Sequence, residues 1–193
     1  MEKKDLLRFK SIPTLRTDRL RLRRMEKCDL YDVFKYTSDP EVPKYLLWEP
    51  HSSLEETRRY LARVSRLYRR ARFYDWGVEH EGRIIGTVGF TSFDIRNDKG
   101  EIGYVISRDF WHRGIASEAV RAVLKFGFES LSLNRIEARF LPENEGSLRV
   151  AQSCGMTLEG TMREALLVKG RYRDVSVAAV TAAEYFDRLK NEK

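Results

Sequence analysis

The sequence predicts a single α/β domain in which a mixed β-sheet is covered by helices. Three strand-like segments follow one another between Trp76 and Ile106, with short turns between them. A long amphipathic segment, Ile115–Leu131, comes next and leads into a further strand-like segment, Arg135–Phe140. Consecutive antiparallel strands followed by a crossover helix are typical of a mixed sheet. The 193 residues fit one such domain with one core.

The N-terminal third predicts one strand and two helices. Leu15–Met25 alternates leucine with arginine, the period of a strand with one face in the core. A first helix is expected from the acidic start at Glu26 to Asp39-Pro40. Ser53–Glu56 offers a capping box for a second helix. That helix has one apolar stripe, formed by Leu54, Thr57, Leu61, Val64 and Tyr68.

The rest of the chain is predicted to consist of hairpins and helices. A turn at Glu81-Gly82 joins the strands Trp76–His80 and Arg83–Phe93, and a turn at Asn97–Gly100 leads into Glu101–Ile106. After Arg135–Phe140 we expect a short helix at Ser147–Cys154, which Gly155 ends. A hairpin follows, with strands Thr157–Val168 and Arg171–Val180 and a turn at Lys169-Gly170. The last expected helix covers Tyr185–Leu189.

The formal net charge of +7 belongs to the N-terminal third, where residues 1–74 hold 19 Lys and Arg against 11 Asp and Glu. Such an excess attracts phosphate-bearing ligands, nucleoprotein surfaces or acidic substrates, although solvated helix faces produce the same count. Much of it lies opposite the apolar stripe of the second helix, at Arg58, Arg59, Arg63, Arg66, Arg69 and Arg70. This face is interpreted either as a solvated surface or as a docking face for a substrate presented beside RNA.

Several classes of protein are excluded by composition. No apolar run approaches the roughly 20 residues of a membrane-spanning helix, and the N-terminus does not resemble a secretory signal, so we expect a cytoplasmic protein that does not associate with membranes. Cys28 and Cys154 are far apart and are expected to be buried thiols rather than a disulfide or metal ligands. Because His51, His80 and His112 are dispersed, no metal site is predicted.

The loop Trp111–Ser117 lies between a predicted strand and the long predicted helix. Unpaired backbone amides and the positive end of the helix macrodipole meet at a helix start, which favours an anion. Gly114 and Ala116 have little or no side chain to block a phosphate. A Walker sequence and the dinucleotide fingerprint are both excluded, because their Gly-Lys-Ser/Thr and three-glycine patterns are missing. The loop is therefore a candidate pyrophosphate site, or else a plain strand-to-helix turn.

Two motifs resemble those of the GNAT acetyltransferases. Glu101–Ile106 followed by Trp111–Ala119 is similar to the acetyl-CoA motif of that family, and Pro142–Ser147 with Cys154–Met156 looks like its second motif. The family's loop often begins with Gln or Arg and ends with Gly, whereas this chain has Trp and Ala at those positions. The resemblance covers roughly residues 12–188.

Two further segments, Leu15–Arg23 and Tyr172–Asp174, resemble the branch of the family that includes the ribosomal-protein (alanine or serine) N-acetyltransferases. The resemblance implies the GNAT fold, an α/β (α+β) arrangement with a mixed, mostly antiparallel sheet of about seven strands flanked by helices. The sheet would be splayed at the cofactor site, between Glu101–Ile106 and Arg135–Phe140. We expect residues 1–193 to form one N-acetyltransferase domain, with 1–11 as a flexible N-terminal extension, acetyl-CoA as co-substrate and no metal.

The resemblance also assigns residues to the site. Cofactor contacts are expected from Val105 and Ile106, which would pair with the pantetheine arm, from the pyrophosphate loop at His112, Arg113, Gly114, Ile115, Ala116 and Ser117, and from Asn144. Glu101 is the candidate general base, or a strand-end charge paired with an arginine. Ser147 is the candidate proton donor for the leaving sulfur, the N-cap of a short helix, or both. Tyr45 and Trp48 would line the acceptor slot or pack in the core.

Three functions stay open on sequence alone. The first is acetylation of the N-terminal amine of a ribosomal protein, and the second is acetylation of a small amine such as an amino acid, a polyamine or an antibiotic. The third is a non-catalytic, basic RNA- or protein-binding module. A protein acceptor predicts an open slot, and a small acceptor predicts a closed pocket with a carboxylate for its second charge. The family often dimerises, so the closing hairpin is also a candidate homodimer interface.

Overall fold

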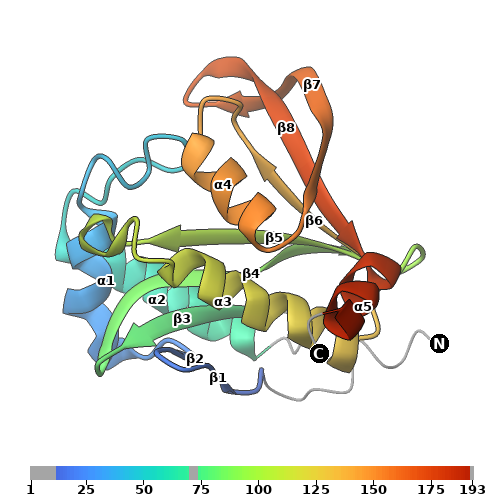
Figure 1. The fold of residues 1–193 in the computed structure, drawn as a ribbon. Helices are drawn as coiled ribbons and strands as arrows, with labels where there is room; N and C mark the ends of the chain where they lie inside the picture. Colours follow the sequence, from blue (N-terminus) through green and yellow to red (C-terminus); the bar gives the residue numbers. More distant parts are fainter. Residues whose placement is uncertain (1–11, 70–73, 192–193) are drawn as a thin grey trace.

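The computed structural model describes residues 12–69 and 74–191, so the expected N-terminal extension at 1–11 and Arg70 of the second helix lie outside the described residues. The strands are β1 (Leu15–Arg16), β2 (Arg21–Arg23), β3 (Tyr74–His80), β4 (Arg83–Asp94), β5 (Lys99–Ile106), β6 (Arg135–Phe140), β7 (Thr157–Val168) and β8 (Arg171–Thr181). They form one sheet in the order β1-β2-β3-β4-β5-β6-β8-β7 (Figure 1). Among the described strands, only β5 and β6 are parallel neighbours. The predicted mixed, mostly antiparallel sheet is confirmed.

In the part of the chain that the structure describes, five α-helices flank this sheet. They are α1 (Leu30–Thr37), α2 (Leu54–Tyr68), α3 (Ile115–Lys125), α4 (Glu145–Ser153) and α5 (Ala182–Asn191). Figure 1 shows α2 passing behind the sheet and α3 passing in front of it. On the α3 side the ring of Phe126 packs edge-on against Trp76 of β3, with 5.4 Å between ring centroids. Burial of such aromatic side chains contributes about 1.5–3 kcal/mol each.

The prediction of a single strand over Leu15–Met25 is wrong. The chain forms two short strands instead, because a turn closed by the amide of Thr17 and the carbonyl of Leu20 (3.0 Å) reverses its direction. The two strands pair with each other, and β2 pairs with β3. The described part of the sheet therefore has eight strands rather than about seven.

The predicted starts of α2 and α3 are confirmed. The other three helices begin elsewhere: α1 at Leu30 after a 3₁₀ turn, α4 two residues before Ser147, and α5 three residues before Tyr185. Ser53 caps α2 by accepting a hydrogen bond from the amide of Glu56, as its capping-box position predicts. The long predicted helix consists of two parts: α3 ends at Lys125, and a π-helical turn, Phe126–Ser130, follows it. Of the two thiols expected to be buried, Cys154 is buried but Cys28 is exposed. Cys28 lies in the 3₁₀ turn before α1, where its side chain faces solvent rather than the core.

The parallel strands β5 and β6 part midway. They pair only between Lys99–Ile102 and Arg135–Ala138. Beyond this point β6 stays with β8, while Gly103–Ile106 stays with β4. Figure 1 shows the two strands diverging from a common end. The β6-facing backbone edge of Gly103–Ile106 is therefore left open to a ligand.

The β7–β8 hairpin turns at Lys169 and Gly170, as predicted, and both residues have the positive φ that a tight two-residue turn requires. The hairpin extends away from the rest of the sheet (Figure 1). Its large exposed apolar side chains are Leu158, Met162, Leu166, Leu167 and Tyr172. A homodimer through this face stays a prediction.

Candidate active site

The start of α3 presents backbone amides from a turn of unusual conformation. Gly114 precedes the helix with φ of 73°, and His112 two residues earlier is also left-handed, with φ of 60°. The first intrahelical bond runs from the amide of Glu118 to the carbonyl of Gly114 (3.0 Å), so the amides of 115–117 have no acceptor within the helix. These amides and the helix macrodipole together favour an anion.

A contact that sequence reasoning missed braces this helix start. Arg19, from the turn between β1 and β2, donates to the carbonyl of Arg113 (3.0 Å) and to the carboxylate of Glu118 (2.7 Å). The hydroxyl of Thr17 donates to the same carboxylate. Burial opposes ionisation of Glu118, but these hydrogen bonds outweigh it, so the pKa of Glu118 lies below its ordinary value. The only sequence signal was the acidic residue in the first turn of α3.

With acetyl-CoA as the ligand that the resemblance implies, replacing Arg19 by Met is expected to raise the KM for acetyl-CoA about fivefold with little change in kcat, because a half-exposed pair contributes about 1 kcal/mol. Steady-state kinetics with acetyl-CoA as the varied substrate measure both constants. Arg21→Met is the matched control, since Arg21 is equally exposed (44% against 46%) but pairs with Glu79. Equal effects of the two substitutions would show that the brace does not act on the loop.

The second wall of the site is α4, which Asn144 caps. The side chain of Asn144 accepts a hydrogen bond from the amide of Ser147 (3.1 Å), so the alternative that Ser147 is the N-cap is wrong. Ser147 lies one turn further on because the helix begins at Glu145. The hydroxyl of Tyr104, on β5, donates to the carbonyl of Ser147 (2.9 Å) and fastens α4 across the parting strands. Within the described residues the Ser147 hydroxyl itself has no hydrogen-bond partner.

Between these walls lies a cavity of about 700 Å³. Of the predicted site residues, those that line it are Tyr45, Val105, Ile106, His112, Gly114, Ile115, Ala116, Ser117, Asn144 and Ser147. Arg113, Trp48 and Glu101 are not among the lining residues. Arg113 lies over the ring of Phe110, and Trp48 packs against the core. The structure thus brings ten predicted residues, from segments far apart in the chain, to one cavity.

Two of the lining residues, Trp111 and Ser117, use their side chains in hydrogen bonds within the protein. The indole of Trp111 donates to the carbonyl of Ile106 (2.7 Å), which links the loop to the open edge of β5. The hydroxyl of Ser117 lies 2.7 Å from that of Ser153 and ties α3 to α4. Ser107 donates to the carbonyl of Ile85 (2.7 Å), and in this register the backbone groups of Val105 also point toward β4. The amides of Ile106 and Ser117 therefore remain the clearer backbone contacts for a ligand.

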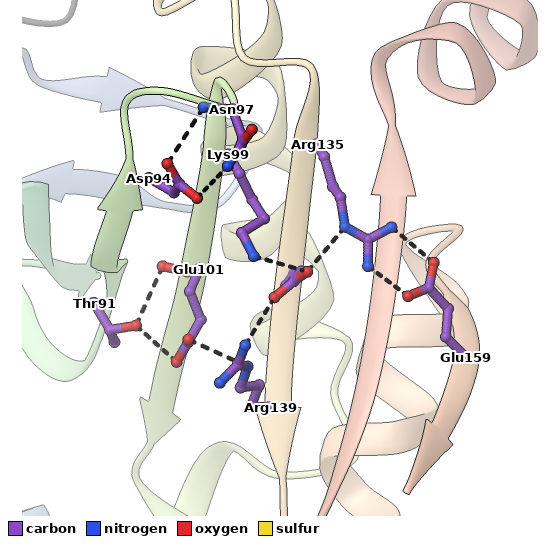
Figure 2. Close-up of polar contacts among 9 residues, drawn as sticks. Thr91, Asp94, Asn97, Lys99, Glu101, Arg135, Arg139 and Glu159 are labelled. Atoms are coloured by element: carbon purple, nitrogen blue, oxygen red, sulfur yellow. Dashed lines mark hydrogen bonds and ion pairs between the residues drawn. The ribbon is translucent and has the colours of Figure 1, made fainter. Parts of the chain in front are cut away.

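Glu101 lies in a charged network on the sheet rather than in the cavity (Figure 2). Its carboxylate accepts from Thr91 (3.1 Å) and pairs with Arg139 (3.4 Å). Glu137, its register partner on β6, pairs with Arg139 and Lys99. The directly opposed carboxylates of Glu101 and Glu137 would repel each other, so the cations of Arg139 and Lys99 stabilise the end of the paired segment of β5 and β6. This is the arrangement of a strand-end charge paired with an arginine.

The tip of the β7–β8 hairpin reaches the loop between α1 and α2. The ammonium of Lys169 donates to the carbonyl of Pro43 (3.1 Å) and pairs with Glu49 (3.3 Å). The same loop contributes Tyr45 to the cavity. Because Lys169 and Pro43 are 126 residues apart, sequence reasoning gave no signal for this contact.

A family model described as the acetyltransferase (GNAT) domain matches residues 19–157. The chain belongs to the GNAT acetyltransferases. It is 38% identical to the N-acetyltransferase p20 of Bacillus licheniformis over 174 residues, which cover 89% of this chain and 98% of that protein. A GNAT acetyltransferase of Bacillus anthracis has a solved structure with a TM-score of 0.78 and 29% identity, covering 89% of this chain and 99% of that one.

Relatives of this acetyltransferase are named for different acceptors. A protein named as a putative ribosomal N-acetyltransferase of Bacillus subtilis is 33% identical over 60% of this chain and 59% of its own length. A spermidine N(1)-acetyltransferase of Vibrio cholerae is 24% identical over 88% of this chain and 96% of its own length. The chemistry is acetyl transfer, and these names leave the acceptor open.

Two further findings concern metal binding and membrane insertion. Within the described residues, His, Cys, Asp and Glu form no group of three or more that could hold a metal ion. None of the described helices is both long enough and apolar enough to span a membrane.

Proposed function

We propose that this acetyltransferase takes the acetyl group from acetyl-CoA and transfers it to the N-terminal α-amine of a protein, with ribosomal proteins as the first candidates. The observation that carries the proposal is a cavity that joins the start of α3, the open edge of β5 and the hydroxyl of Ser147, which has no partner among the described residues. Each of these three suits one part of the reaction.

The start of α3 fits the pyrophosphate of acetyl-CoA. The free amides of 115–117 and the macrodipole supply the positive potential. A side chain at Gly114 would be strained in its left-handed conformation, so glycine keeps the turn in shape. Ile106, whose backbone groups face away from β4, offers its amide at the open edge of β5 for the pantetheine arm. Acetyl-CoA supplies an acetyl group activated as a thioester.

Ser147 would donate a proton, or a hydrogen bond, to the leaving sulfur. Its backbone is held from two sides, by Asn144 at the amide and by Tyr104 at the carbonyl, while its hydroxyl stays available. Such fixing of a donor before the reaction lowers the cost of reorganisation. Asn144 and Tyr104 act as positioning residues.

The proton of the attacking ammonium would leave to water in the cavity. The carboxylates that line the cavity each have a cationic partner: Glu41 pairs with Lys44, Glu143 with Arg173 and Glu145 with Arg149. A hydrogen bond from its own backbone amide and another from Arg173 lower the pKa of Glu143, which makes it a weaker base.

The same pairing supports a protein acceptor over a polyamine. A polyamine needs carboxylates for the ammonium groups that do not react, and the three lining carboxylates are already paired with cations within the described chain. A protein N-terminus brings only one ammonium to the reaction. The alternative of a small amine is supported by the relative named as a spermidine acetyltransferase.

A thiol-release assay with acetyl-CoA separates the two acceptors. The panel contains peptides that begin with ribosomal-protein N-termini, together with polyamines and amino acids. We expect turnover on the peptides. Turnover on small amines alone would replace the protein acceptor, and no turnover on any member of the panel would contradict the proposed reaction.

The role of Glu101 is tested by Glu101→Gln. We expect kcat to change by less than about threefold, because the substitution removes a half-exposed ion pair and keeps the contact with Thr91. Glu159→Gln is the matched control, since Glu159 pairs with Arg135 in the same network and does not line the cavity. A loss of about 10²-fold or more for Glu101→Gln alone would instead identify Glu101 as the general base.

A further inference from the structure

The outer face of α2 carries a row of arginines that the acetyl-transfer site does not use. Arg59, Arg63 and Arg66 follow one another at helical spacing and are all exposed. None of the three forms an ion pair with a residue that the structure describes, whereas Arg58 pairs with Glu55. Arg63 lies over the ring of Tyr60, with 5.9 Å to the ring centroid, which restricts its guanidinium.

The chemistry of this arginine row, defined as Arg59, Arg63 and Arg66, suits phosphates better than a protein partner. The apolar side chains of α2 face inward, where Leu61 and Val64 are buried. The row therefore has no apolar centre, which the core of a protein–protein interface usually has. Protein–nucleic acid interfaces are more polar and strongly positive. Arginine also binds phosphate through two parallel hydrogen bonds.

The geometry points to a duplex rather than to a single strand. The row extends about 10 Å along the helix axis, about three phosphate-to-phosphate steps of 3.4 Å on one strand of a duplex. Proteins that bind single strands place exposed aromatic side chains between the cations for stacking on bases. The exposed residues of α2 are all polar or charged.

We propose that the arginine row of α2 is a second binding surface, which holds the phosphate backbone of duplex RNA. The choice of RNA over DNA rests on the proposed function, because a ribosomal-protein acceptor is presented beside RNA. The surface would hold the enzyme near its acceptor without reading sequence, since guanidinium contacts to phosphates carry no base information.

Fluorescence anisotropy with a labelled 20-base-pair RNA duplex tests the proposal on the full chain without acetyl-CoA. Three phosphate contacts predict a log–log salt slope of about −2.7, a loss of roughly 40-fold in affinity between 50 and 200 mM salt. The double substitution Arg63→Gln with Arg66→Gln should reduce this slope by about two. Its acetyl transfer to a free amine should stay unchanged, because neither residue lines the cavity.

The matched control removes the same charge elsewhere, by Arg96→Gln with Arg163→Gln, both exposed and outside the row. The control should keep the salt slope of the parent chain. An equal loss in the control would show that binding follows net charge alone and would overturn the proposal. Tighter binding to the matching DNA duplex or to polyglutamate than to RNA would also overturn it. Since RNA binding is measured by anisotropy and not by turnover, a failed peptide assay and a failed RNA measurement are separate results.

Discussion

Ser147→Ala is expected to lower kcat about a hundredfold while the KM for acetyl-CoA stays within about twofold. The side chain lines the cavity, and its hydroxyl has no partner among the described residues, so removal affects the reaction rather than the fold. The helix cap should survive, because Asn144 is bonded to the amide of Ser147 and not to its hydroxyl. Steady-state kinetics with a peptide acceptor measure both constants.

Ser147→Thr serves as the conservative control, since it keeps a hydroxyl at the same position and should restore part of the lost kcat. Thermal unfolding of the alanine variant should match that of the parent chain within about 2 °C. A lower unfolding temperature with an unchanged kcat would assign Ser147 a structural role and would remove the proposed proton donor.

Gly114→Val is expected to raise the Kd for CoA at least tenfold and to lower the free energy of unfolding by about 1–3 kcal/mol. Crowding is not the cause, because the nearest heavy atom to a Cβ at this position is the Arg19 guanidinium at 3.6 Å. The cause is the left-handed φ of 73°, which a β-branched residue adopts only with strain. Relief of this strain would move the amides of 115–117. Calorimetric titration with CoA and denaturant unfolding give the two quantities.

Gly114→Asn separates conformation from side-chain volume. Asparagine adopts the left-handed region more readily than other residues, so this variant should keep most of its affinity for CoA. Equal losses in the valine and asparagine variants would show that space for the phosphate, rather than the shape of the turn, requires glycine here.

Local chemistry explains which elements could be predicted from the sequence. The β7–β8 hairpin follows from alternation on both sides of Lys169-Gly170, and β6 was predicted at its observed bounds. The start of α2 follows from the capping serine Ser53. In each of these elements the signal lies within a few residues of the structure that it specifies.

The missed features depend on contacts between distant segments. The turn that divides Leu15–Met25 places Arg19 against Glu118, 99 residues later. Glu101 takes its ion pair from a neighbouring strand, in a register that only the folded sheet defines. The alternative that Ser147 caps α4 is wrong and Asn144 is the cap; both residue types are good N-caps and stand three residues apart.

The sequence by itself determined the family, the order of most elements and the loop that prepares the start of α3, because turn residues, caps and periodicity act over short distances. The tertiary structure decided which of the predicted residues share a cavity. The parting of β5 from β6 after Ile102 opens the edge of Gly103–Ile106, while the paired part of β5 places Glu101 beside Arg139 and away from the cavity lining. Register and long-range pairing depend on the whole sheet, so no local segment of the sequence contains them.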